Sequence, residues 1–307
     1  KLPVKVIEVS FEQSTKSKAL NKTMSQLPDD LYDIGVVLDA DNMMERDFLK
    51  RVNDSYNAGF IAIQGHRLAK NTNTSFAILD AVSEEINNSI FRKGHRRWGL
   101  SSSLIGSGMA FDYRFFKALM STVKAVGGFD KEIELKMLKQ GIKIEYLDKA
   151  LVYDEKVQKE EVFVKQRRRW LSAQIHYAKY FGDALKSFFI HGNIDYLDKA
   201  KQMLLPPRIL LIGLLPICLL LSIFLNPLSF TIIWASLMAM LILTLLFAIP
   251  RKFYYVKTLG AILSIPKGIF LMFTSLLTTK GANKKFIHTE HTSSEEKSTK
   301  QQAPDDK

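Results

Sequence analysis

The feature that most constrains this chain is a stretch without any charged side chain, from Ile209 to Ile249. It contains two apolar runs, Ile209–Leu225 and Phe230–Ile249, separated by a short uncharged turn. Each run approaches the roughly 20 residues that a helix needs to cross a bilayer. All 43 Lys and Arg residues and all 31 Asp and Glu residues lie outside this stretch. The sequence therefore predicts a polar domain joined to a multi-pass membrane anchor.

Positive charge flanks the two apolar runs on their outer sides. Arg208 precedes them, Arg251 and Lys252 follow them, and the turn between them carries no positive residue. Cytoplasmic loops carry an excess of Lys and Arg, so both ends of the chain are predicted to face the cytoplasm. The single cysteine, Cys218, allows no intramolecular disulfide and gives no reason to expect an oxidising compartment. Because the net charge of +12 gathers near the membrane segments, we expect membrane lipids and no nucleic acid as partners.

Residues 1–160 alternate short β-branched runs with helical patterns, which is typical of an α/β domain with a mostly parallel sheet. The β-branched runs predict strands at Val4–Val9, Ile34–Leu38, Gly59–Gln64, Leu104–Phe111 and Lys143–Tyr146. Apolar residues at helical spacing predict helices at Lys18–Leu27, Glu45–Asn57, Ser75–Asn88, Arg114–Ala125 and Lys131–Lys139. The chain begins with Lys1 and opens directly on a strand pattern, so we expect it to be N-terminally incomplete, with the first strands missing.

Four further segments are predicted after this domain. Residues 161–205 are helical, basic and aromatic, as in helices that lie along a membrane surface, and residues 206–250 form the two spans. In residues 251–291, the run Leu259–Thr279 is interrupted by Pro266 and Lys267. We favour an in-plane amphipathic helix there over a third span, because a charge at mid-helix is costly in lipid. Residues 292–307 have almost no apolar side chains and are predicted to be a disordered tail.

The strongest local motif follows the buried-strand pattern Ile34–Leu38. Two carboxylates one residue apart, Asp39 and Asp41, come at the end of this strand. Mg²⁺ and Mn²⁺ prefer one or two carboxylates together with phosphate oxygens, so a metal site is one interpretation. The N-cap of a following helix is an equal alternative. An EF-hand would need Gly where Met44 stands, and no P-loop motif occurs in the chain.

Four other stretches have both a chemical and an ordinary interpretation. The segment KSKALN at residues 16–21 suits phosphate binding or is a solvated helix start, and the glycines of GSG at residues 106–108 allow close backbone approach. Glu132 and Glu134 are catalytic candidates or acids of a first helical turn. The segment QRRRW at residues 166–170 is a binding motif or a juxtamembrane cluster that attracts anionic lipid.

Taken in order, these motifs resemble one family. The series KSKALN, DAD, QGHR, GSGMAF, GGFDKEIEL and QRRRW before paired spans looks like the membrane-bound family 2 glycosyltransferases with a GT-A fold. That family includes cellulose, chitin and hyaluronan synthases, and the bacterial exopolysaccharide glycosyltransferases look nearest. The resemblance covers roughly residues 5–290, and the order of D-x-D and Q-x-x-R-W is its most specific part.

The resemblance implies a donor site. Asp39 and Asp41 would hold the sugar nucleotide and its Mg²⁺ or Mn²⁺, with Asp41 as the direct metal ligand. Lys18 and Asn21 would belong to the donor-binding loop. Of the Q-x-x-R-W residues, Gln166 and Arg169 would engage the donor diphosphate.

The resemblance also implies an acceptor side and a catalytic base. The segment Gly106, Ser107 and Gly108 would line the acceptor side, and Trp170 would stack on the acceptor sugar. The family usually places Glu-Asp before the base-bearing helix, whereas Lys131-Glu132 stands there in this chain. We assign the base to Glu132, with Asp130 as the alternative.

The implied function is an inverting transfer from a UDP-sugar to a hydroxyl of a saccharide or lipid-linked acceptor. We expect it at the cytosolic face of the bacterial inner membrane, in exopolysaccharide or cell-surface glycan synthesis. Two certain spans favour a transferase that does not secrete its product. The alternative is a membrane-anchored scaffold that binds sugar nucleotides and has lost catalysis, because Lys131-Glu132 departs from the family pattern.

Overall fold

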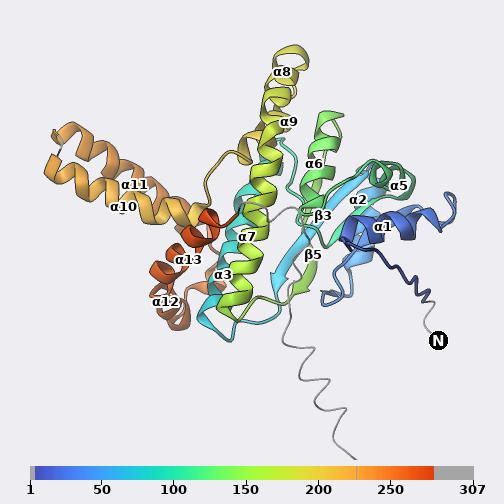
Figure 1. The fold of residues 1–307 in the computed structure, drawn as a ribbon, viewed down its shortest axis with the longest axis horizontal. Coiled ribbons are helices and arrows are strands. Elements are labelled where there is room, and N and C mark those ends of the chain that lie inside the picture. Colours follow the sequence, from blue (N-terminus) through green and yellow to red (C-terminus); the bar gives the residue numbers. More distant parts are fainter. Residues whose placement is uncertain (1–3, 226, 280–307) are drawn as a thin grey trace, which may run out of the picture.

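A five-stranded mixed sheet forms the centre of the polar domain. The computed structural model describes residues 4–225 and 227–279, and the sheet has the order β1-β4-β3-β5-β2. Its strands are β1 (Ile34–Val37), β2 (Met43–Met44), β3 (Ala62–Ala69), β4 (Met109–Asp112) and β5 (Glu145–Asp154). Helices cover the sheet, so the expected α/β class is confirmed (Figure 1).

The expectation of a mostly parallel sheet is wrong. Among the strands that the structure describes, β3 and β5 alone pair in parallel, whereas β1 with β4, β3 with β4, and β2 with β5 are antiparallel. The reason is that β4 lies between β1 and β3 and runs against both. The predicted strand Val4–Val9 is also not formed, because this segment pairs with none of the strands in the described part of the chain and leaves Val4 and Val6 more than 70% exposed.

The other predicted strands exist with shifted bounds. Strand β3 continues past the predicted end at Gln64, and β5 starts at Glu145 and continues to Asp154, eight residues beyond the predicted end at Tyr146. Beside β5, the register of β3 shifts between Gly65 and His66. A Cβ at Gly65 would lie 2.6 Å from the Phe48 side chain, so a residue without a side chain permits this close packing.

Helices of the domain begin close to where the apolar spacing predicted them. They are α1 (Lys16–Ser25), α2 (Phe48–Asn57), α3 (Ser75–Asn87), α4 (His95–Arg97), α5 (Tyr113–Ser121) and α6 (Phe129–Lys139), with a π-helical stretch at Asn88–Gly94. Side-chain oxygens of Thr15, Thr74 and Asp112 accept hydrogen bonds from the first turns of α1, α3 and α5. Such N-caps satisfy backbone donors that would otherwise lack partners, which explains why these helices begin there.

A second group of helices leads from the domain to the apolar pair. It comprises α7 (Glu160–Tyr177), α8 (Phe181–His191), α9 (Ile194–Gln202), α10 (Arg208–Leu225) and α11 (Leu228–Ala248). Helices α10 and α11 lie side by side and project together from the rest of the protein (Figure 1). They are long and apolar enough to cross a membrane, with 18 and 21 residues. Their outer side chains are exposed in the structure, as lipid-facing residues would be.

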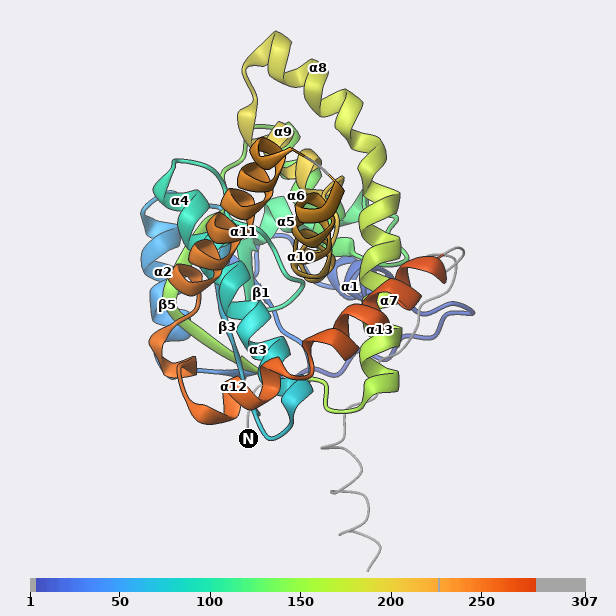
Figure 2. The same ribbon diagram turned by 90° about the vertical axis from the view of Figure 1, so that its left-hand side faces the viewer.

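The third apolar run forms two short helices, α12 (Val256–Ile262) and α13 (Ile265–Leu277). They are bent by 47° at the break between them, so counting them as one span would raise the number of candidate spans to three. Helix α12 packs on α3, and α13 crosses α7 near its start (Figure 2). The predicted disordered tail, residues 292–307, and the end of the 251–291 segment lie outside the described residues.

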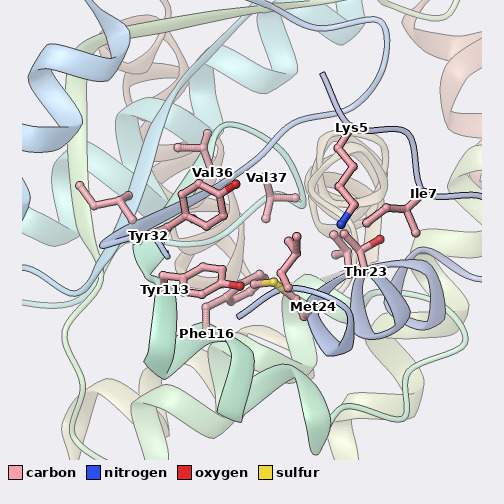
Figure 3. A pocket seen from close by; sticks show the side chains of 13 residues that line it. Lys5, Ile7, Thr23, Met24, Tyr32, Val36, Val37, Tyr113 and Phe116 are labelled. Carbon is pink, nitrogen blue, oxygen red and sulfur yellow. The ribbon is translucent and has the colours of Figure 1, made fainter. Parts of the chain in front are cut away.

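A pocket of about 400 Å³ lies at the free edge of β1. Side chains from the N-terminal segment, α1, β1 and α5 line it, including Lys5, Met24, Val37 and Phe116 (Figure 3). None of the predicted site residues belongs to its lining. The candidate site therefore lies elsewhere, beyond the carboxyl end of β1.

Candidate functional site

The D-x-D turn meets two other segments directly after β1. The turn closes with a hydrogen bond from the backbone N–H of Asn42 to the backbone carbonyl of Asp39, 3.1 Å long. Lys16 Nζ forms an ion pair with Asp39 and donates to the Gly106 carbonyl at 2.7 Å. The Asp39 amide donates to Ser107 Oγ at 2.9 Å. The start of α1, the end of β1 and the GSG loop before β4 thus converge on Asp39.

The GSG loop requires its glycines for this approach. Gly106 and Gly108 have φ values of +82° and +63°, in the left-handed region that favours glycine. A Cβ at Gly108 would also lie 3.2 Å from Val152. The loop backbone can therefore come close both to the sheet and to a ligand.

Asp130 and Arg169 lie near the segments that meet at Asp39. A Cβ at Gly106 would lie 3.9 Å from Cγ of Asp130, and the Phe129 ring lies 5.3 Å from Lys16 Nζ. Burial lowers the pKa of Arg169, while the charges of Asp130 and Asp39 act in the opposite direction, so the guanidinium is within electrostatic range of both. Helices α6 and α7 thus contribute one carboxylate and one cation beside Asp39.

The Glu132 side chain does not face Gly106 as Asp130 does, but packs against other residues. Its carboxylate lies 2.7 Å from Lys136 Nζ and 3.4 Å from the hydroxyl of Tyr177, and it accepts from the Lys124 amide at 3.3 Å. Residues two apart on a helix are separated by about 200° around its axis, so Asp130 and Glu132 face opposite sides of α6. The structure therefore brings Asp130 together with Gly106 and holds Glu132 between α6 and Tyr177.

The two lysines of KSKALN separate in the same way. Lys18 Nζ donates to the Gln13 carbonyl at 2.9 Å and lies over the Phe11 ring, so it points toward the N-terminal segment. Lys16, which the sequence analysis did not single out as a site residue, is the lysine that contacts Asp39. The motif KSKALN contains both lysines, so the sequence indicated a cation at this place. Which of the two side chains faces Asp39 depends on how α1 packs.

Two predicted donor-binding residues carry buried amide oxygens. Asn21 Oδ1 and Gln166 Oε1 have no hydrogen-bond partner among the residues that the structure describes. A buried acceptor without a partner is costly, so such atoms often await a ligand or water. Both are therefore suited to accept hydrogen bonds from a polar ligand.

Trp170 lies further along α7, with 37% of its surface exposed. The Arg167 guanidinium lies 4.3 Å from the centre of its ring and 4.7 Å from that of Phe163. An ion pair with Asp80 on α3 holds this guanidinium in place. One face of the indole is thus covered by a fixed cation, and the exposed part of the side chain is available for contact with a ligand.

The carboxylate oxygens at the D-x-D turn suit a divalent cation whose other ligands come from a substrate. Within residues 4–225 and 227–279, no group of three or more His, Cys, Asp or Glu side chains could hold a metal. Mg²⁺ and Mn²⁺ commonly bind through one or two carboxylates plus substrate phosphates and water. Asp39 and Asp41 provide this number of hard oxygen ligands at one turn, so they fit such an ion if a phosphorylated ligand completes its shell.

Comparisons with known proteins identify the family. No curated protein sequence matches the chain. Among solved structures, the chain resembles the mannosyltransferase PcManGT from Pyrobaculum calidifontis in complex with GDP-Man and Mn²⁺. The identity is 16% and the TM-score 0.43, over 89% of this chain and 67% of that one. Residues 1–173, more than half of the 307, match the family described as Glycosyltransferase like family 2. The chain therefore belongs to glycosyltransferase family 2, and it is a glycosyltransferase.

Proposed function

We propose that this glycosyltransferase moves a sugar from a nucleoside diphosphate sugar to an acceptor hydroxyl, with inversion at the anomeric carbon. The observation that carries this proposal is the convergence of Lys16, Asp39, Asp130 and Arg169 from four separate segments. Two cations and two carboxylates at one place suit a reaction that separates charge between a nucleophile and a departing diphosphate.

Asp130 is the proposed general base. It would accept the proton of the acceptor hydroxyl as the oxygen attacks the anomeric carbon from the face opposite the diphosphate. Glu132 is less suited to this role, because Lys136 and Tyr177 already engage its carboxylate. A single displacement of this kind needs no covalent intermediate on the protein.

The remaining groups would bind the donor. Lys16 and Arg169 would neutralise negative charge on the diphosphate, and Asn21 and Gln166 would accept hydrogen bonds from the donor. A Mg²⁺ or Mn²⁺ ion held by Asp39 and Asp41 would supply further positive charge at the diphosphate oxygens.

We propose a UDP-sugar as donor and a saccharide or lipid-linked acceptor that stacks on the partly exposed Trp170. The GSG loop at residues 106–108 would lie against that acceptor. The position of α7 between the domain and the apolar pair supports an acceptor near a membrane surface. We place catalysis on the cytosolic side of a bacterial inner membrane, in exopolysaccharide or cell-surface glycan synthesis, and the charges that flank the apolar pair and the order of the motifs support this proposal.

The test measures nucleotide release by the full chain in detergent, with UDP-sugars and GDP-sugars, membrane lipid extract, and either Mn²⁺ or EDTA. We expect metal-dependent release that falls about 10²- to 10⁴-fold in Asp130→Asn, the usual contribution of a general base. Glu132→Gln is the matched control on the same helix and should lose less than about tenfold. The opposite ranking would contradict the assignment of the base, and donor binding without release in the wild type would favour a catalytically inactive scaffold.

A further inference from the structure

Asn42, the residue after the D-x-D motif, joins three segments of the site through its side chain. Its Nδ2 donates to Asp154 Oδ1 at 2.9 Å and lies 3.3 Å from Asp41 Oδ1. Its Oδ1 accepts from the Ser107 hydroxyl, and that hydroxyl oxygen in turn accepts from the Asp39 amide. The amide of Asn42 thus links the D-x-D turn to the GSG loop and to the end of β5.

Asp154, the far end of this link, is itself held by buried cations. Lys156 Nζ lies 2.9 Å from Asp154 Oδ2, and Arg67 Nε lies 3.7 Å from the same oxygen. Burial alone would raise the pKa of Asp154, but the charges of Arg67 and Lys156 outweigh it and lower that pKa. The carboxylate is therefore ionised and fixed, and it is a strong acceptor for the Asn42 amide.

The cations belong to a cluster of buried charges behind the D-x-D turn. Glu84 on α3 pairs with Arg67 at 2.8 Å, with Lys156 at 2.9 Å and with Arg92 at 3.7 Å. Arg67, Arg92 and Lys156 carry three positive charges against the two negative charges of Glu84 and Asp154. Burial alone would lower the pKa of Arg67, but Glu84 and Asp154 outweigh it and raise that pKa, and the charge of Asp39 adds to their effect. The cluster therefore lies within electrostatic range of Asp39.

We propose that Asn42 and Asp154 are positioning residues of the donor site. Asp154 orients the Asn42 amide, and Asn42 holds the D-x-D turn and the GSG loop at the separation that a metal-bound diphosphate needs. The inference rests on the proposed function, because it assigns these residues to the geometry of the same site. Neither residue needs to touch the reacting atoms.

The test compares Asn42→Ala and Asp154→Asn with the wild type in the full, detergent-solubilised chain. The readout is calorimetric binding of UDP and GDP over a range of Mn²⁺ concentrations, together with the KM for donor, kcat and the melting temperature. Loss of a hydrogen bond to a charged group predicts about 10- to 100-fold weaker nucleotide binding at fixed Mn²⁺ in each variant. More Mn²⁺ should be needed for half-saturation, and KM should rise more than kcat falls.

A double variant and a control variant on the same strand complete the experiment. The double variant should lose no more affinity than Asn42→Ala alone, because Asp154 has no amide left to orient once the Asn42 side chain is removed. Asp148→Asn is the control, since Asp148 is an aspartate of the same strand that contacts Lys93 and His66 and has no hydrogen bond to Asn42 among the described residues. Nucleotide binding by this variant should match the wild type.

Unchanged Mn²⁺ dependence in Asn42→Ala, or additive losses in the double variant, would overturn the inference. Asn42 is only half-buried, so its alanine variant decides the matter even if Asp154→Asn does not fold. If the wild type binds neither nucleotide with Mn²⁺, the proposed function itself fails. Wild-type binding that Asn42→Ala leaves intact refutes the positioning role alone.

Discussion

Replacement of Lys156 by Met tests the buried charge cluster directly. The Lys156 side chain is only 2% exposed, and its Nζ lies 2.9 Å from carboxylate oxygens of both Glu84 and Asp154. The substitution conserves most of the volume but leaves two buried carboxylates to share Arg67 and the more distant Arg92. Removal of one member of a buried ion pair typically costs about 3–5 kcal/mol, because the remaining charge is left without compensation. We expect a loss of stability of this size.

Thermal unfolding of the solubilised protein measures this loss. A domain of this size changes its melting temperature by about 2–4 °C for each kcal/mol, so Lys156→Met should melt roughly 6–20 °C below the wild type. Lys93→Met is the matched control, because Lys93 pairs with Asp148 at 2.6 Å but both side chains are more than 40% exposed. An exposed pair contributes at most about 1 kcal/mol. Equal melting temperatures for the two variants would refute the view that the cluster supports the fold of the site.

Two other predictions concern the acceptor side and the response to acid. Arg167→Lys removes the planar guanidinium that lies over Trp170, so we expect a roughly fivefold higher KM for acceptor, about 1 kcal/mol, with Mn²⁺-dependent nucleotide binding unchanged. Weaker nucleotide binding in this variant would instead assign the cation to the donor. Burial alone would raise the pKa of Glu85, but contacts with His66 and Lys252 outweigh it and lower the pKa to about 2. Because the folded-state pKa is below the ordinary value of 4.5, Glu85 contributes about 3 kcal/mol above pH 4.5, and this is lost as the pH falls toward 2. The stability of Glu85→Gln should therefore fall less steeply with pH over that window. An unaltered slope would contradict a stabilising role for the ion pair between Glu85 and Lys252, whose charged atoms lie 2.6 Å apart.

Local sequence patterns were sufficient for much of the fold. The apolar run Ile209–Ile249 allows only a helical pair, because a helix satisfies its own backbone hydrogen bonds in an apolar environment. The helix Phe129–Lys139 and the strand before Asp39 were predicted from period and turn residues to within a few positions. The order of the motifs also identified the family, which the match over residues 1–173 confirms. Each of these features depends on residues that are close in sequence or on the order of motifs along the chain, so the sequence alone is sufficient to predict it.

Only the tertiary structure decided which side chains meet. Strand β4 enters the sheet antiparallel between two strands that are distant in sequence, and the period-2 pattern of a strand contains no information on direction. Asp39 faces Lys16 and not Lys18, and Gly106 faces Asp130 and not Glu132. In both cases the two candidates lie two residues apart on a helix, about 200° around its axis, so the packing of that helix selects between them. The sequence thus determined the apolar helical pair, the motifs and their order, whereas long-range packing determined the strand directions in the sheet and the charges that surround Asp39.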